Sequence, residues 1–296
     1  MTLLISGISG FIGKNLTSFL NGKYTIQPFL RNSKLSTSYD IFIHLAGKAH
    51  DRRKTSNPEE YYRVNTELTK ALFDAFLDSD AKAFIFLSSV KAVADEVEDS
   101  LTEVCIPSPI THYGKSKLLA EQYILSKPNP EGKRFYILRP CMIHGPGNKG
   151  NLNLLYSLVS KGIPWPLGAF KNKRSFCSID NLMFIIRELI ERDDIPSGVY
   201  NVADDSPLST NDVISILAES QNRKAKIWDV SKGLIQSFAK LGDILRLPLT
   251  TERLQKLTES YVVSNQKIKS AIGKDLPVSA KDGLLKTFNS FQINAQ

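Results

Sequence analysis

Cysteine is scarce in this chain of 296 residues, and the three that occur, Cys105, Cys141 and Cys177, lie far apart. They offer neither a disulfide framework nor a metal-binding cluster, which is typical of proteins from a reducing compartment. Long hydrophobic runs are also missing, since no apolar stretch approaches the ~20 residues that a membrane span needs. The N-terminus has no charged leader of the kind that begins a signal peptide. The sequence therefore predicts a cytoplasmic protein with no membrane partner.

A strong excess of one charge is absent as well. The net charge is +8, and the basic residues are scattered rather than gathered into a stripe laced with aromatic side chains. This distribution suits small anionic ligands and argues against nucleic acid as a partner. The hydrophobic fraction of 42% is ordinary for a soluble globular protein, and the length allows one large α/β domain or a domain with a smaller lobe.

Three glycines follow the first apolar run. Residues 3–6 predict a buried parallel strand, and Gly7, Gly10 and Gly13 then lead into a helix-like stretch over residues 14–20. In a dinucleotide-binding turn the first glycine permits the turn, the second lets a diphosphate approach the backbone, and the third lets the helix pack on the sheet. A plain strand-to-helix turn is the alternative, because a glycine triplet alone is a weak signal.

The second predicted strand covers residues 24–30 and is followed by Arg31. In a dinucleotide fold this position faces the adenosine ribose, where an arginine accommodates the 2′-phosphate of NADP. An exposed arginine at a strand end is the alternative. The gap over residues 33–39 is too short for a helix and another strand, so we expect the usual third strand to be missing and the sheet edge to be exposed there.

Small residues end the next strand, over residues 40–45, and they leave room for a ligand at its carboxyl end. His44 is expected to be a packed histidine rather than a catalytic base. A strand over residues 83–88 then brings the hydroxyls of Ser88 and Ser89 to the same edge. Tyr113 and Lys117 share one face of the following helix, because they are four residues apart.

Together these pieces resemble the extended short-chain dehydrogenase/reductases of the nucleotide-sugar epimerase/dehydratase group. The matching pieces, in order, are Gly7-x-x-Gly10-x-x-Gly13, His44-Leu45-Ala46-Gly47, Asn65, Ser88-Ser89, Tyr113-x-x-x-Lys117, Arg139-Pro140, His144-Gly145-Pro146-Gly147, Arg174-Ser175-Phe176 and Tyr200-Asn201-Val202. The resemblance covers nearly the whole chain and is weakest beyond Ser206. It is greatest to bacterial enzymes that reduce or epimerise C4 of UDP-linked N-acetylated sugars for surface polysaccharide.

The resemblance implies a Rossmann-type doubly wound parallel sheet, shortened at the third-strand edge, with a smaller α+β lobe at the C-terminal side. The cofactor domain is expected over residues 1–140 plus 175–204, and the substrate lobe over 141–174 plus 205–296. NADP(H) is favoured and NAD(H) is possible. The residues expected to bind the cofactor are Gly7, Ser9, Gly10, Phe11, Ile12, Gly13, Arg31, Leu45, Ala46, Gly47, Asn65, Ser88, Lys117 and Pro140.

The implied catalytic group is Ser89, Tyr113 and Lys117. Tyr113 is the acid/base, Ser89 bonds the same sugar oxygen, and Lys117 is expected to lower the pKa of the phenol with the help of the oxidised nicotinamide. A guanidinium suits a diphosphate, and the resemblance assigns the nucleotide diphosphate to Asn151 and Arg174. The weaker candidates for contact with the substrate are Arg253 and Lys91.

The sequence also separates related reactions. A 4,6-dehydratase needs an acidic pair directly after the hydroxyl residue, whereas Val90 and Lys91 stand there. A 4-keto reductase of a UDP-sugar is favoured, an NAD-dependent 4-epimerase is the alternative, and a non-catalytic NADP-sensing module is a second alternative. Members of the group often dimerise, and the resemblance implies a homodimer formed through helices over residues 58–79 and 113–126.

Overall fold

The structure is a computed structural model, and it describes residues 1–30, 38–49, 57–148, 150–245 and 249–293. Its centre is a six-stranded parallel sheet with the order β2-β1-β3-β4-β5-β8. The strands are β1 (Thr2–Ser6), β2 (Thr25–Phe29), β3 (Ile41–His44), β4 (Ala83–Leu87), β5 (Arg134–Pro140) and β8 (Gly198–Val202). The sheet is of the predicted Rossmann type. None of the helices in the described ranges is long and apolar enough to cross a membrane.

The chain reverses its direction across the sheet at β1, because β2 lies on one side of it and β3 on the other. This is the topological switch point beside which ligands bind in open α/β sheets. Among the described residues no strand lies outside β2, as the short gap predicted. Pro28 sits within β2, and an edge strand tolerates a proline that cannot donate to a ladder. Arg31, predicted to accommodate the 2′-phosphate of NADP, lies outside the described residues.

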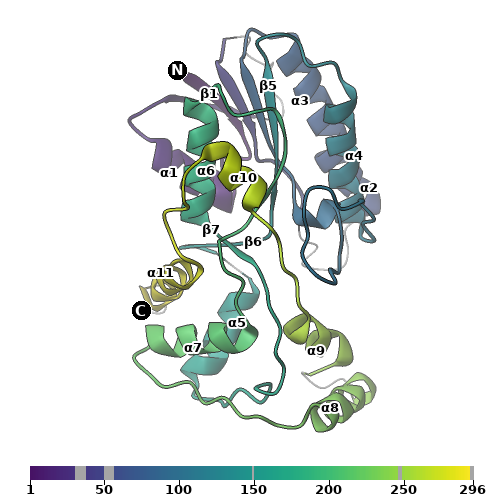
Figure 1. The fold of residues 1–296 in the computed structure, drawn as a ribbon, viewed down its shortest axis with the longest axis vertical. Coiled ribbons are helices and arrows are strands. Elements are labelled where there is room, and N and C mark those ends of the chain that lie inside the picture. The colour runs from purple at the N-terminus through teal and green to yellow at the C-terminus, as the bar shows by residue number, and fades with distance from the viewer. Residues whose placement is uncertain (31–37, 50–56, 149, 246–248, 294–296) are drawn as a thin grey trace.

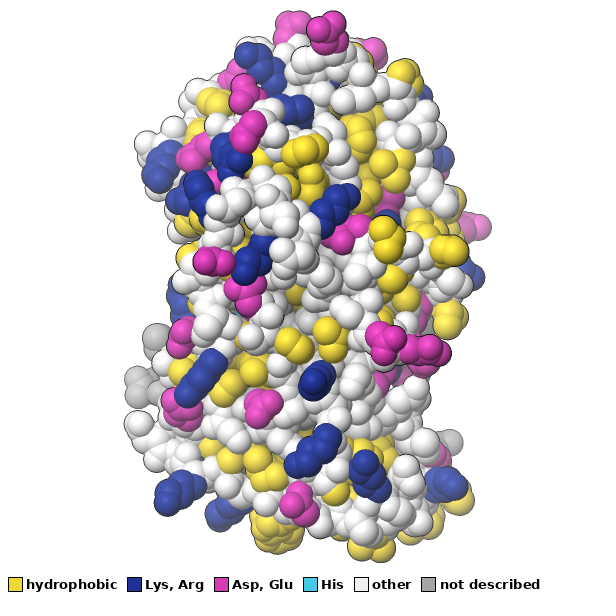
Figure 2. Space-filling view, viewed as in Figure 1, with side chains coloured by type: hydrophobic (Ala, Val, Ile, Leu, Met, Phe, Trp, Pro, Cys, Tyr) yellow, Lys and Arg dark blue, Asp and Glu magenta, His cyan; other side chains and the backbone are white. Residues whose placement is uncertain are grey.

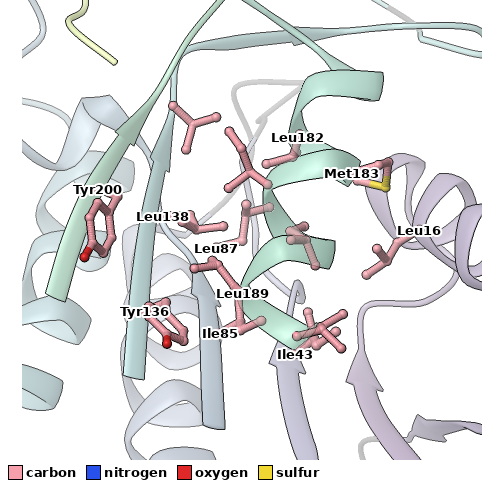
Figure 3. Packing of buried hydrophobic residues seen from close by; sticks show 14 of the residues in the cluster. Leu16, Ile43, Ile85, Leu87, Tyr136, Leu138, Leu182, Met183, Leu189 and Tyr200 are labelled. Carbon is pink, nitrogen blue, oxygen red and sulfur yellow. The ribbon is translucent and has the colours of Figure 1, made fainter. Parts of the chain in front are cut away.

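Side chains alternate between two hydrophobic layers because successive residues of a strand point to opposite faces. Leu3, Ile43 and Ile85 belong to the cluster under α1 (Phe11–Leu20) and α6 (Ile179–Glu191). The alternate residues of the same strands, among them Phe42, pack beneath α3 (Leu68–Leu77) and α4 (His112–Ser126). Figure 1 shows these helix pairs on opposite faces of the sheet, and Figure 3 shows side chains of α6 meeting those of the strands.

The helix predicted over residues 58–79 is not uniform. It begins as α2 (Pro58–Tyr61), widens into the π-helix η1 (Tyr62–Glu67) and continues as α3. A π-helical turn holds an extra residue, is rare, and is found disproportionately at functional sites. Periodicity did not reveal this turn, because one extra residue barely disturbs a helical pattern.

A second hydrophobic cluster lies below the sheet in Figure 1. Its main elements are α5 (Asn151–Ser160), α7 (Thr210–Ser220), α8 (Lys232–Leu245), α9 (Thr251–Thr258) and α11 (Ala280–Ile293), with the short pair β6 (Met142–His144) and β7 (Phe176–Ser178) above them. The helix α10 (Gln266–Ile272) packs near β8. The exact division into cofactor domain and substrate lobe stays a prediction.

The helix α8 packs into this cluster through one face only. Ile235, Ala239 and Gly242 are buried, whereas Leu234 and Phe238 are among the large side chains that α8 exposes. Figure 2 shows that basic and acidic side chains intermingle over most of the face in view.

Candidate active site

The glycine loop joins β1 to α1 and is shaped by close contacts between backbones. Gly7 has φ +74°, and a Cβ there would lie 2.6 Å from the Ala46 nitrogen. A Cβ on Gly13 would lie 2.3 Å from the carbonyl oxygen of Gly7. The loop can therefore press against both β3 and α1 only because these two positions lack side chains.

Gly10 differs from the other two glycines. A Cβ built on it would meet only the Gly7 carbonyl oxygen within 4 Å, at 3.3 Å. Gly10 is the N-cap of α1, and no side chain accepts from the N–H groups of the first turn there. An uncovered helix N-terminus favours an anion through its N–H groups and its dipole. The loop thus fits the diphosphate of a dinucleotide, with Ser9, Phe11 and Ile12 as the adjoining residues.

His44 is completely buried at the end of β3. Its Nδ1 lies 2.6 Å from the Ser6 hydroxyl, and its Nε2 lies 2.9 Å from the Thr69 hydroxyl. The Thr69 hydroxyl donates to the Asn65 carbonyl at 2.7 Å, so its oxygen accepts from Nε2–H and Nδ1 accepts from Ser6. His44 is therefore a packed, neutral histidine, as predicted, and it ties β1 to Thr69 of α3.

Burial, followed by the nearby charge of Lys117, lowers the pKa of His44 to about 3. In the unfolded chain a histidine has a pKa of ~6.5, so only the unfolded chain takes up this proton between those values. His44 therefore makes the folded state less stable as the pH falls below ~6.5.

We expect the free energy of unfolding to fall by about 2 kcal/mol more in the natural protein than in His44→Gln when the pH is lowered from 8 to 5. Urea titrations of both proteins at the two pH values measure this difference. Parallel losses in the two proteins would contradict the assignment of a neutral His44.

Asn65 connects the π-helical turn to the loop after β3. Its Oδ1 accepts from the Lys48 N–H at 2.7 Å, and its Nδ2 donates to the Lys48 carbonyl at 3.0 Å and to the Ser116 hydroxyl at 2.9 Å. A Cβ on Gly47 would lie 3.1 Å from Lys117 Nζ and 3.3 Å from Asn65 Oδ1. Gly47, Asn65 and Lys117 therefore meet around one space at the carboxyl edge of the sheet.

Ser89 and Tyr113 come together at the same edge. A hydrogen bond with Ser89 lowers the pKa of Tyr113, but burial has the larger effect and raises that pKa above its ordinary value. The Ser89 oxygen accepts from the Lys91 N–H at 3.2 Å, and the Ser89 hydroxyl is therefore the donor in its hydrogen bond with Tyr113. In the protein alone the pKa of Tyr113 is raised by burial and by Glu121 and lowered by Ser89. That Lys117 lowers this pKa together with the oxidised nicotinamide stays a prediction.

Lys117 lies one turn beyond Tyr113 and is almost fully buried. Its Nζ donates to the Leu87 carbonyl at 2.8 Å and lies 4.7 Å from the centre of the Phe86 ring. Burial lowers the pKa of Lys117 to about 8, and the nearby Glu121 carboxylate opposes that shift.

The hydroxyl of Ser88 donates to Glu121. The contact of Ser88 with the cofactor stays a prediction. Glu121 in turn binds Arg139 of β5. The sequence analysis did not single out Glu121, although it stands four residues after Lys117 on the same face. Pro140, the last residue of β5, pairs with Val202 of β8.

Two of the expected substrate residues lie near each other. Lys91 Nζ donates to the Asp95 carbonyl at 2.8 Å and lies 4.2 Å from the centre of the Tyr261 ring. Arg174 lies 3.6 Å from Glu259, and both of these charges act on Lys91, whose pKa is lowered chiefly by burial.

The other two residues expected to contact the substrate are Arg253 and Asn151. Arg253 lies in the first turn of α9, and the carbonyl of Lys256 on the same helix accepts from Arg174. Asn151 is the first residue of α5, but its side chain is outside the described part of the structure.

The glycine loop, the parallel sheet, and the serine, tyrosine and lysine at the carboxyl edge agree with one family. The family model described as "NAD dependent epimerase/dehydratase family" matches residues 22–203, which is more than half of the chain. The chain belongs to this family. As an epimerase/dehydratase family member it is an NAD(P)-dependent enzyme of the extended short-chain dehydrogenase type, as the sequence predicted.

Individual relatives of this epimerase/dehydratase family member extend over its full length. It is 28% identical over 323 residues to a UDP-glucose 4-epimerase of Vibrio cholerae, covering 98% of this chain and 95% of the relative. It is 27% identical over 322 residues to an N-acetyl-alpha-D-glucosaminyl-diphospho-ditrans,octacis-undecaprenol 4-epimerase of Escherichia coli O157:H7, covering 99% and 96%. The UDP-N-acetylglucosamine 4-epimerase from Bacillus cereus shares its fold, with a TM-score of 0.76 at 17% identity over 99% of both chains.

Proposed function

We propose that this protein is an NADP(H)-dependent reductase of a UDP-linked 4-keto sugar, N-acetylated and 6-deoxy, that serves surface polysaccharide synthesis. The observation that carries the proposal is that Tyr113 is hydrogen-bonded to Ser89, with Lys117 one turn further along α4 and bound to the Leu87 carbonyl at the end of β4. These groups stand at the carboxyl edge of the sheet, from which the glycine loop also leaves β1. Such a group can move a proton at a sugar oxygen while the neighbouring loop holds a diphosphate. When bound, the reduced nicotinamide supplies the hydride to C4.

The protonation state of Tyr113 supports reduction of a keto sugar rather than oxidation of an alcohol. Because burial raises the pKa of the phenol, Tyr113 carries its proton at neutral pH. A protonated phenol can give that proton to O4 as the keto group is reduced. The Ser89 hydroxyl, which bonds Tyr113 in the protein alone, is proposed to donate to the same oxygen when substrate binds, and the positive charge of Lys117 stabilises the phenolate that remains.

The residues after Ser89 argue against a dehydratase. Val90 is buried, and Lys91 is held by the Asp95 carbonyl and the Tyr261 ring. A dehydratase needs one group that protonates the leaving hydroxyl and a second that takes the proton from C5. Val90 and Lys91 do not form such a pair. Lys91 and Arg174 are instead proposed to face the anionic part of the UDP-sugar, since both are cations close to each other.

The edge of the sheet at β2 argues for a cofactor that binds and leaves in every turnover. Within the described residues β2 is the outermost strand, so less protein covers the side on which the adenosine half of a dinucleotide would lie. A reductase must release its cofactor in every turnover, whereas an epimerase must keep it. Arg31 in the sequence supports NADP over NAD.

The second candidate function is an NAD-dependent 4-epimerase of a UDP-hexose. It is favoured by the relatives from Vibrio cholerae and Escherichia coli, because each matches nearly the whole chain and is named a 4-epimerase. The same Ser89, Tyr113 and Lys117 would serve it, with the proton moving in both directions at O4. The difference between the two candidates is whether the cofactor leaves.

We expect the purified protein to carry no tightly bound cofactor and to consume NADPH when mixed with a UDP-4-keto-6-deoxy-N-acetylhexosamine. Absorbance at the wavelength of NADPH and chromatography of the UDP-sugars measure the two parts of this prediction. Copurified NAD(H) with interconversion of UDP-GlcNAc and UDP-GalNAc would favour the epimerase. NADPH binding without turnover of any UDP-sugar would favour the sensing module.

A further inference from the structure

A buried charged cluster lies directly behind the catalytic group. The side chain of Glu121 on α4 is completely buried, and that of Arg139 on β5 is nearly so. Arg139 Nε lies 3.1 Å from Oε1 and 3.0 Å from Oε2 of Glu121, and its Nη2 also donates to Oε2. The Ser88 hydroxyl donates to Oε1. The carboxylate therefore joins α4 to the ends of both β4 and β5.

The helix α4 places this carboxylate in line with the catalytic residues. Tyr113, Lys117 and Glu121 follow one another at four-residue intervals, so they occupy one stripe of the helix. Ser88, which Glu121 holds, directly precedes Ser89. Glu121 is thus linked to the catalytic group twice, along α4 through Lys117 and along β4 through Ser88.

We propose that Glu121 is a positioning residue for the reaction, which keeps Lys117 charged and holds the end of β4 so that Ser89 faces Tyr113. The inference rests on the proposed function, because Lys117 matters here as the neighbour of the proton-transferring phenol. Glu121 does not itself touch the reacting atoms.

The groups around Lys117 make Glu121 its principal counter-charge. From β3 it faces His44, which is neutral, and from α4 it faces Tyr113, which is protonated. Asn65 of η1 and the Leu87 carbonyl of β4 are uncharged. In the described structure only the carboxylate of Glu121, itself bound to Arg139, opposes the effect of burial on the pKa of Lys117, which lies at about 8.

Removing the charge of Glu121 tests this role. In Glu121→Gln, Arg139 and Lys117 remain as buried cations without a partner, so the pKa of Lys117 is expected to fall by about one unit or more. In the double variant Glu121→Gln with Arg139→Gln both charges of the pair are gone, and we expect a smaller fall in the pKa of Lys117. Ser88→Ala keeps both charges and is expected to lower kcat without moving the pKa of Lys117.

Two readouts are needed. The first is an NMR titration of protein labelled with ¹³C at Cε of lysine, in which Lys117→Met assigns the Lys117 signal. The second is the pH profile of kcat for the sugar reduction, whose alkaline limb should move to lower pH by the same amount as the Lys117 titration. Circular dichroism establishes that each variant is folded.

An unchanged Lys117 titration in either folded glutamine variant would overturn the proposal, and the double variant provides this test even when the single one does not fold. A uniform fall of kcat at every pH, without movement of the alkaline limb, would also overturn it. Because the titration needs neither cofactor nor substrate, a natural protein that shows the Lys117 titration but reduces no sugar would refute the proposed function alone.

Discussion

Replacing Tyr113 with Phe is expected to lower kcat by a factor of about 10² to 10⁴, the range that a general acid supplies. The phenyl ring keeps the packing of the side chain but carries no proton for O4. The Kd for NADPH should change by less than about threefold, because the glycine loop and Lys117 are untouched. Initial rates of NADPH consumption and a fluorescence titration of NADPH measure the two quantities.

The same helix offers a matched control. Tyr123 lies on α4, and its hydroxyl donates to both carboxylate oxygens of Asp74, at 2.8 and 2.6 Å, away from the catalytic group. Tyr123→Phe removes an identical hydroxyl and is expected to cost about 1 kcal/mol of stability while kcat is unchanged. Activity retained by Tyr113→Phe, or lost equally in both variants, would contradict the role given to Tyr113.

The glycine loop provides the second large effect, through a comparison of two single methyl groups. In Gly13→Ala the new Cβ would lie 2.3 Å from the Gly7 oxygen and 2.6 Å from the Ile8 Cα, both backbone atoms. Since these atoms cannot move away without displacing the loop, we expect a loss of about 1–3 kcal/mol of stability. We also expect the Kd for NADPH to rise more than about tenfold, because the displaced loop no longer presents its N–H groups.

Gly10→Ala should behave differently. Gly10 has φ −74°, which alanine adopts, and its Cβ would meet only the Gly7 oxygen at 3.3 Å. We therefore expect stability to fall by no more than about 1 kcal/mol, the cost of alanine at an N-cap. The Kd for NADPH should still rise more than about tenfold, because the methyl group occupies the face where a diphosphate would lie. Urea unfolding and a fluorescence titration separate the two variants.

Equal stability losses in Gly10→Ala and Gly13→Ala would show that both glycines serve packing alone. Unchanged affinity for NADPH in Gly10→Ala would contradict the proposal that the open face of the loop holds the cofactor.

Several features were readable from the chain because their signals are local. The strand that ends at Gly7, the glycines at intervals of three, and the tyrosine and lysine four residues apart all lie within short stretches whose periods and backbone needs are set by the residues themselves. The short gap after Leu30 likewise predicted that no third strand lies outside β2 among the described residues. Packing of His44 followed from its place at the end of an apolar strand.

The features that the sequence missed depend on distant residues. Glu121 looked like one polar residue of a helix, and only the approach of Ser88 and Arg139 shows that it is buried and bound. The π-helical turn contains Asn65, whose contacts with Lys48 and Ser116 are encoded in no local pattern.

The sequence by itself determined the order of strands and helices, the glycine loop and the residue types at the carboxyl edge of the sheet, because each follows from local backbone preference and side-chain period. Only the tertiary structure decided the protonation of the catalytic residues. Burial raises the pKa of Tyr113 and lowers that of Lys117, and the extent of burial is set by segments far apart in the chain that pack around them.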